Sequence, residues 1–228
     1  MTIGKTNSLD PRTHSLEAEQ WKAFEREMAT RAEAHVTALQ LIDPEQIYFT
    51  LREDIYTAYQ ERWHRTRKQC DPATIIETCV MAMHSYLSKQ SSYGLLYTFG
   101  YSALGATPLI EQLVELNVAI YDIRFSARSR SHKWRKPYLK EWLGDRYHHL
   151  PELGNIHFDE PGSGIELADP TTGVPLVMQL LLEKKHVALM CVCKDHDECH
   201  RSDAANEIVA HIPDALLIPF PSLENYHS

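Results

Sequence analysis

The spacing of apolar residues divides the chain into two parts. In the first 93 residues, apolar side chains recur every three or four positions with charged residues between them, which is typical of amphipathic helices. Pro44 and Pro72 each follow an aspartate that can cap a helix, so each suits a first helical turn. We therefore expect an all-helical N-terminal extension, residues 1–93, with helices at about 15–41, 43–68 and 71–90.

The pattern changes at Leu95, where short apolar runs begin to alternate with helical periodicity. The apolar runs predict five strands, at about 95–99, 118–123, 146–150, 187–193 and 215–220. The segments between them predict helices at about 107–116, 137–143, 174–184 and 202–212. Alternating strands and helices imply an α/β fold, and we expect residues 94–228 to form a mostly parallel, Rossmann-like sheet with flanking helices.

One connection is unusually long. Residues 155–173 are rich in glycine, proline and aspartate, and ordinary connections are shorter. This segment is either an active-site lid or a disordered insertion. In an open α/β sheet, ligands bind beyond the carboxyl ends of the strands, so we expect any chemistry at that edge.

Composition narrows the classes of protein. The chain has 228 residues, 43% hydrophobic and 24% charged, which is ordinary for a globular protein. No apolar run approaches the roughly 18 to 20 residues of a membrane helix, and the N-terminus lacks a secretory pattern, so we expect no membrane association and a cytoplasmic location. The net charge of −8 argues against a surface that binds nucleic acid everywhere, although a local basic site remains compatible with it.

Three of the five cysteines lie within nine positions, where the fourth predicted strand meets a helix. Cys199 lies at the expected helix start beside Arg201, and both features favour a thiolate. Cys199 is therefore a candidate nucleophile, with His200 or His196 as its base. Free cysteines are also among the most buried residues, so these thiols can equally serve only to pack the core.

A metal site is the second interpretation of the same residues. Cys191, Cys193, Cys199 and His200 offer four soft ligands for zinc or iron, and His196 offers a fifth. The spacing differs from that of most structural zinc sites, whose ligand pairs are separated by two to four residues.

A basic segment follows the second predicted strand. Residues 124–136 hold six lysines or arginines and no acid, with serines and a tryptophan among them. This composition suits a phosphate-bearing ligand, either a nucleotide or nucleic acid, with Arg124, Arg128 and Arg130 as its ligands. A solvated charged face is the alternative. His149, at the end of the third predicted strand, is a candidate acid or base.

Taken together, these segments resemble the bacterial and archaeal family called domain of unknown function 488, over about residues 94–220. The most specific element is Cys191 followed eight residues later by Cys199-His200-Arg201. The resemblance implies a compact α/β domain and leaves the activity open. Carried over position by position, it points to Gly100, Ser102, Asp122, Arg124, Ser129, Arg130, His149, Leu153, Gly154, Cys191, Cys199, His200 and Arg201.

The chain also departs from that family. Tyr101 stands where the family commonly has histidine, Asn155 where it has a second glycine, and Cys193 near a frequent acid. If the family's histidine or acid is catalytic, this chain has lost or altered the activity. Residues 1–93 match nothing in the family.

Three hypotheses follow. The first is an enzyme-like domain that binds a phosphate-bearing ligand. Its catalytic candidates are Cys199, His200 and His149, and its binding candidates are Arg124, Arg128, Arg130, Ser102 and Arg201. The second is a non-catalytic module for nucleic acid or a nucleotide, whose helices 15–90 bind a protein partner or a second copy of the chain. The third is the metal-binding protein.

Overall fold

The structure is a computed structural model and describes residues 11–41, 43–66, 72–103, 105–160 and 162–220. Its N-terminal part consists of three helices, as the periodicity predicts: α1 (Pro11–Leu39), α2 (Pro44–Thr66) and α3 (Pro72–Gln90). Helix α1 begins four residues earlier than we expected. The predicted end of the second helix at 68 and start of the third at 71 lie outside the described residues.

The remainder of the chain forms a five-stranded sheet in which every pairing is parallel. The spatial order is β3-β2-β4-β1-β5. The strands are β1 (Leu96–Gly100), β2 (Ala119–Asp122), β3 (Tyr147–His149), β4 (Val187–Cys191) and β5 (Leu217–Pro219). The connecting helices are α4 (Ala106–Glu115), α5 (Lys136–Leu143), α6 (Pro170–Leu182) and α7 (His200–His211). The predicted α/β fold with a helical N-terminal extension is confirmed.

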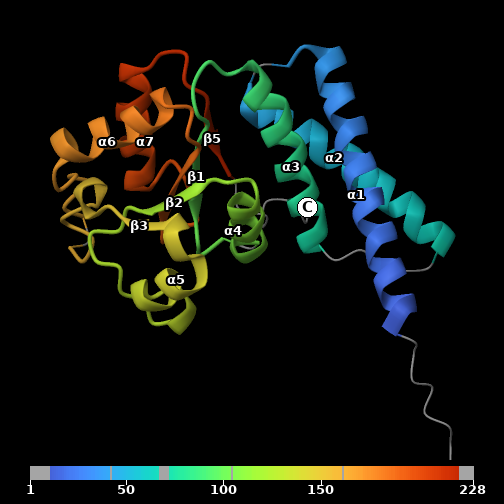
Figure 1. Ribbon diagram of the computed structural model, residues 1–228. Coiled ribbons are helices and arrows are strands. Elements are labelled where there is room, and N and C mark those ends of the chain that lie inside the picture. Colours follow the sequence, from blue (N-terminus) through green and yellow to red (C-terminus); the bar gives the residue numbers. More distant parts are fainter. Residues whose placement is uncertain (1–10, 42, 67–71, 104, 161, 221–228) are drawn as a thin grey trace, which may run out of the picture.

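The order of the strands explains which helix covers which face. From β1 to β3 the chain moves toward one edge of the sheet, and after β3 it moves back toward the other. With right-handed crossovers, reversing the direction places the helices on the opposite face. Helices α4 and α5 accordingly pack into one core cluster and α6 and α7 into another. Figure 1 shows α6 and α7 on one side of the sheet and α4 on the other.

The helical extension lies on the face that α4 and α5 cover, beside β5 (Figure 1). Tyr48 of α2 meets Phe220 at a ring distance of 6.0 Å, and Phe220 stacks on Tyr97 of β1 at 5.6 Å. Residues of α1, α2 and α3 belong to the same buried cluster as residues of the sheet. The extension and the α/β part therefore share one hydrophobic core.

The long connection before α6 forms a hydrogen-bonded loop. Asn155 pairs with Leu167 across the loop, and its Oδ1 accepts hydrogen bonds from the backbone N–H groups of His157 (3.2 Å) and Glu166 (3.0 Å). Gly154 anchors the loop, because a Cβ atom there would lie 2.3 Å from the backbone nitrogen of Phe125. The described part of this segment is thus held against the start of the basic segment.

Candidate functional site

The site lies at the carboxyl edge of the sheet, where β1 and β4 end side by side. Gly100 of β1 is in register with Cys191 of β4. A Cβ atom at Gly100 would lie 1.6 Å from the carbonyl oxygen of Cys193, so only glycine permits this close approach. Strand β4 ends at Cys191, two residues earlier than predicted, which places Cys193 in the following loop and not on the strand.

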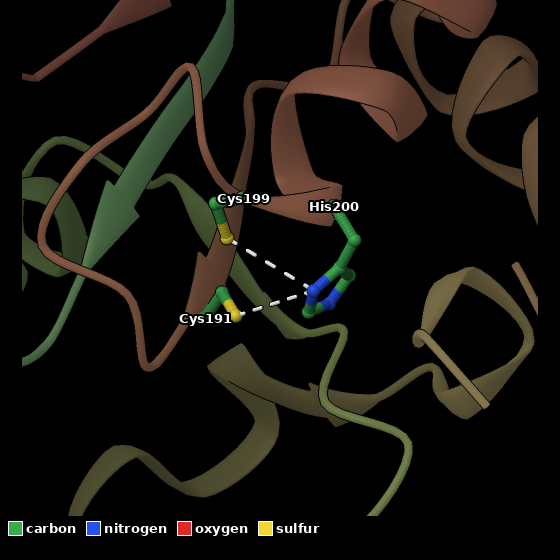
Figure 2. A group of neighbouring side chains, drawn as sticks. All are labelled: Cys191, Cys199 and His200. Carbon is green, nitrogen blue, oxygen red and sulfur yellow. Dashed lines mark hydrogen bonds between the residues drawn. The ribbon is translucent and has the colours of Figure 1, made fainter. Parts of the chain in front are cut away.

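Cys191, Cys199 and His200, which we call the cysteine–histidine cluster, converge at this edge (Figure 2). The Sγ atom of Cys191 lies 3.6 Å from Nδ1 of His200, and that of Cys199 lies 3.9 Å from the same nitrogen. Cys191 comes from the end of β4, while Cys199 is the N-cap residue of α7 and His200 its first residue. All three residues are buried.

The other ring nitrogen of His200 has a definite role. Its Nε2 lies 3.1 Å from the carbonyl oxygen of Ile123, the residue after β2. A carbonyl oxygen only accepts hydrogen bonds, so Nε2 carries the proton and donates. In the neutral ring this leaves Nδ1 with a lone pair that faces the two sulfur atoms.

The third thiol of the region, Cys193, lies in the loop and lines the cavity together with Cys191 and His200. The neighbouring thiols of Cys191 and Cys199 lower the pKa of Cys193, and the nearby charges of His200 and Arg201 lower it further. Interactions among the same three thiols raise the pKa values of Cys191 and Cys199. Burial opposes the charged form of His200, but its contact with Cys199 leaves its pKa raised.

Arg201 is completely buried behind this loop. Its guanidinium donates hydrogen bonds to the carbonyl oxygens of Cys193 (2.5 Å) and Lys194 (3.1 Å). Its Nε has no hydrogen-bond partner, and no carboxylate of the described residues lies within ion-pair distance of it. Arg201 thus holds the cysteine loop from inside the protein and does not face solvent, where we expected it to hold an anion.

Arg124 is also buried, but in an ion pair. Its Nε and Nη2 donate to the two carboxylate oxygens of Asp122 at 2.7 and 2.5 Å, and Nη1 reaches the Tyr101 hydroxyl at 3.3 Å. Tyr147 donates to the same carboxylate at 2.7 Å. Burial disfavours the charged guanidinium, yet the bonds with Asp122 outweigh this and raise the pKa of Arg124. Arg124 therefore points inward, and its charge is already neutralised by Asp122.

A cavity of about 500 Å³ opens beside the cluster. Its lining comes from the basic segment, the long connection and the cysteine loop. Four exposed apolar side chains line it, namely Phe125, Phe158, Ile165 and Val192. The polar or charged lining consists of Arg124, Ser126, Arg128, Asn155, Asp159, Cys191, Cys193, Glu198 and His200.

The structure therefore separates the predicted site residues into two groups. Arg124, Arg128, His200, Cys191 and Cys193 line the cavity, and Cys199 lies directly behind it in the cluster. Ser102, Arg130 and Arg201 do not line it, and His149 uses Nε2 to bind the carbonyl of Arg124 at 2.9 Å. His196 faces Thr98 at 3.1 Å, away from the cluster.

Several lining residues escaped the sequence interpretation, among them Phe158, Ile165 and Glu198. The first two lie in the long connection, where exposed apolar residues in a polar loop were the available signal. Glu198 directly precedes Cys199, and no sequence pattern marks it as a residue of the site. Phe158 and Ile165 line the same cavity as Phe125 and Arg128, and this placement depends on how the loop is anchored at Gly154.

The fold and the site define an α/β protein with a parallel sheet and a buried cysteine–histidine cluster at the carboxyl edge. No helix among the described residues is long and apolar enough to cross a membrane. No protein-family model, curated protein or solved structure matches the chain. The resemblance to the domain of unknown function 488 family thus remains an expectation from the sequence.

Proposed function

We propose that the chain binds a phosphate-bearing ligand, specifically a nucleotide, in the cavity at the carboxyl edge. The observation that carries this proposal is that Arg128 and two exposed phenylalanines, Phe125 and Phe158, line the same cavity. Arginine binds phosphate through its fork of N–H donors, and aromatic rings stack on bases.

Arg128 is the phosphate ligand in this proposal. Its side chain is exposed and makes no hydrogen bond or ion pair with the described residues. The backbone carbonyl of Arg128 accepts a hydrogen bond from Nη1 of Arg124. Arg124 has a different part: its charge is balanced by Asp122, and it holds the backbone of the loop that presents Arg128.

The aromatic pair and the two acids argue for a nucleotide over a bare anion. The rings of Phe125 and Phe158 lie 6.0 Å apart and are tilted by 41°, so they form an apolar mouth. Asp159 and Glu198 also line the cavity and would repel inorganic phosphate. The same carboxylates accept hydrogen bonds from the amino and imino groups of a base.

Binding of nucleoside monophosphates and diphosphates, measured by thermal shift and titration calorimetry, tests the proposal. We expect Arg128→Ala to weaken binding about ten- to 150-fold, because a hydrogen bond to a charged group contributes about 1.5–3 kcal/mol. Arg130→Ala is the matched control, since Arg130 is an exposed arginine of the same loop that does not line the cavity. Equal losses in both variants would reduce the site to a general basic surface.

Removing one ring tests the base. Phe158→Ala should weaken nucleotide binding about five- to 150-fold and leave the affinity for inorganic phosphate unchanged, because stacking contributes about 1–3 kcal/mol per base. Phe49→Ala is the control, as Phe49 is an exposed phenylalanine on α2. No stabilisation by any nucleotide at millimolar concentration would refute the proposal.

A further inference from the structure

The cysteine–histidine cluster has the dimensions of a tetrahedral metal site. With Zn–S bonds of about 2.3 Å and Zn–N bonds of about 2.0 to 2.1 Å, tetrahedral geometry separates a sulfur from a nitrogen by roughly 3.5 to 3.6 Å. The two observed separations from Nδ1 of His200 are 3.6 Å to Cys191 and 3.9 Å to Cys199. All three ligand atoms lie within 4.8 Å of one another.

The orientation of His200 favours a metal over hydrogen bonds among the three groups. Because Nε2 donates to the carbonyl of Ile123, the neutral ring offers a single lone pair at Nδ1. Figure 2 shows both sulfur atoms directed at this one nitrogen. One lone pair accepts one S–H group well, whereas one metal ion can satisfy both sulfurs and the nitrogen together. A backbone carbonyl that orients a ligating histidine is also the usual support of such a site.

Cys193 is the candidate for a fourth ligand. It lines the same cavity as Cys191 and His200, although its Sγ is not among the three ligand atoms that lie within 4.8 Å of one another. Cys193 belongs to a loop and not to β4, so its side chain can rotate toward a metal ion without disturbing the sheet. Arg201 and the close approach of Gly100 hold the backbone of this loop in place.

The buried charge of Arg201 gives an independent reason. This guanidinium is 0% exposed and has no carboxylate partner among the described residues. A buried charge without compensation is costly. Three thiolates, one neutral imidazole and one divalent ion carry a single net negative charge, which Arg201 beside Cys193 would balance.

We propose that Cys191, Cys193, Cys199 and His200 bind one zinc ion, with Arg201 as the buried counter-charge. Thiolate and imidazole ligands select zinc over magnesium and calcium, which prefer oxygen. The ion would join the end of β4 to the start of α7. This proposal does not depend on nucleotide binding in the cavity.

The test uses the full chain, purified without metal-affinity resin. Elemental analysis should find about one equivalent of zinc per chain. After removal of the zinc, titration with cobalt(II) should produce the near-ultraviolet charge-transfer band of cobalt–thiolate bonds, saturating at about one equivalent. A titration without that band would overturn the proposal, and because it uses the unaltered sequence it is independent of how any variant folds.

Variants identify the ligands. Cys199→Ser and His200→Ala should each weaken cobalt binding at least about tenfold. Cys79→Ser is the matched control, because Cys79 is a buried free cysteine on α3, outside the cluster. Equal effects of Cys79→Ser and Cys199→Ser would overturn the assignment.

Cys193→Ser tests the fourth ligand. The charge-transfer intensity should fall by about one third, because one of three thiolates is removed. An unchanged intensity would overturn the role of Cys193. Nucleotide titrations of the metal-free protein, repeated with the Arg128→Ala and Arg130→Ala variants, test nucleotide binding separately from zinc binding. Failure of either proposal therefore leaves the other one testable.

Discussion

Arg124 and Arg201 are both buried at the carboxyl edge of the sheet, and they differ in what balances their charge. Arg124 forms a two-pronged ion pair with Asp122, which a tyrosine hydroxyl also contacts. Arg201 reaches only backbone carbonyls. Burial of an arginine therefore does not define its role. The charge of Arg124 is cancelled by Asp122, whereas Arg201 places a positive charge, unpaired among the described residues, beside the cysteine loop.

The largest effect is expected from removing the partner of Arg124. Asp122→Ala leaves a buried, uncompensated guanidinium and should lower the free energy of unfolding by about 3–5 kcal/mol, measured by urea denaturation. Asp145→Ala, which removes an exposed acid, should change it by less than about 0.5 kcal/mol. A loss below about 1 kcal/mol for Asp122→Ala would mean that the ion pair does not stabilise the edge.

Replacing Arg201 should have an effect on stability that depends on whether zinc is bound. In the zinc-bound protein, Arg201→Met removes the counter-charge and two charged hydrogen bonds and should cost about 2–3 kcal/mol. In the metal-free protein, relief of the buried charge offsets this loss, and we expect a change within about 1 kcal/mol. Arg124→Met should be costly in both states. Denaturation of both variants with and without zinc decides between these outcomes.

Acid sensitivity should arise in another part of the molecule, at the junction of α3 and β1. Burial and, to a smaller extent, the charge of neighbouring His186 lower the pKa of His84 to about 4. The unfolded chain therefore takes up the proton first, so stability is complete above about pH 6.5 and falls toward pH 4.

This contribution is roughly 1–2 kcal/mol after allowing for the partial exposure of His84. In His84→Gln the decline of unfolding free energy over that pH range should flatten, while His211→Gln, which alters an exposed histidine on α7, should retain it. Unfolding measured at several pH values provides the check. An unaltered decline in His84→Gln would assign the acid sensitivity to other groups.

The smallest effect concerns the third arginine of this edge, Arg128. Since its side chain is exposed and has no partner among the described residues, Arg128→Ala should change the free energy of unfolding by less than about 0.5 kcal/mol. The same variant should weaken nucleotide binding strongly. A large loss of stability would show that Arg128 belongs to the framework with Arg124.

Much of this arrangement could be predicted from the sequence. The apolar runs at 95–99 and 118–123 locate β1 and β2, because a strand that is buried on both faces consists almost entirely of apolar residues. Since parallel strands end at one edge, the same pattern placed Arg124 near the cysteines. The proximity of Cys191, Cys199 and His200 follows from the strand–loop–helix junction that carries them.

Other features required the folded chain. Nothing in the sequence indicates that Arg201 turns inward to the carbonyl of Cys193, because that contact depends on the absence of a side chain at Gly100, which is remote in the chain. His149 was a catalytic candidate, but in the structure it supports the backbone of Arg124. The pairing of Phe125 with Phe158 depends on a loop whose periodicity predicts no structure.

The amino-acid sequence was sufficient to predict the helices and strands of this protein and the edge of the sheet where its chemistry-bearing residues gather. Those properties depend on local periodicity and on the geometry common to parallel sheets. The folded chain was needed to show which arginine is neutralised, which one lies beside the thiols, and which nitrogen of His200 points at Cys191 and Cys199. These features follow from charge balance and ligand geometry, which depend on distances between segments that are remote in the chain.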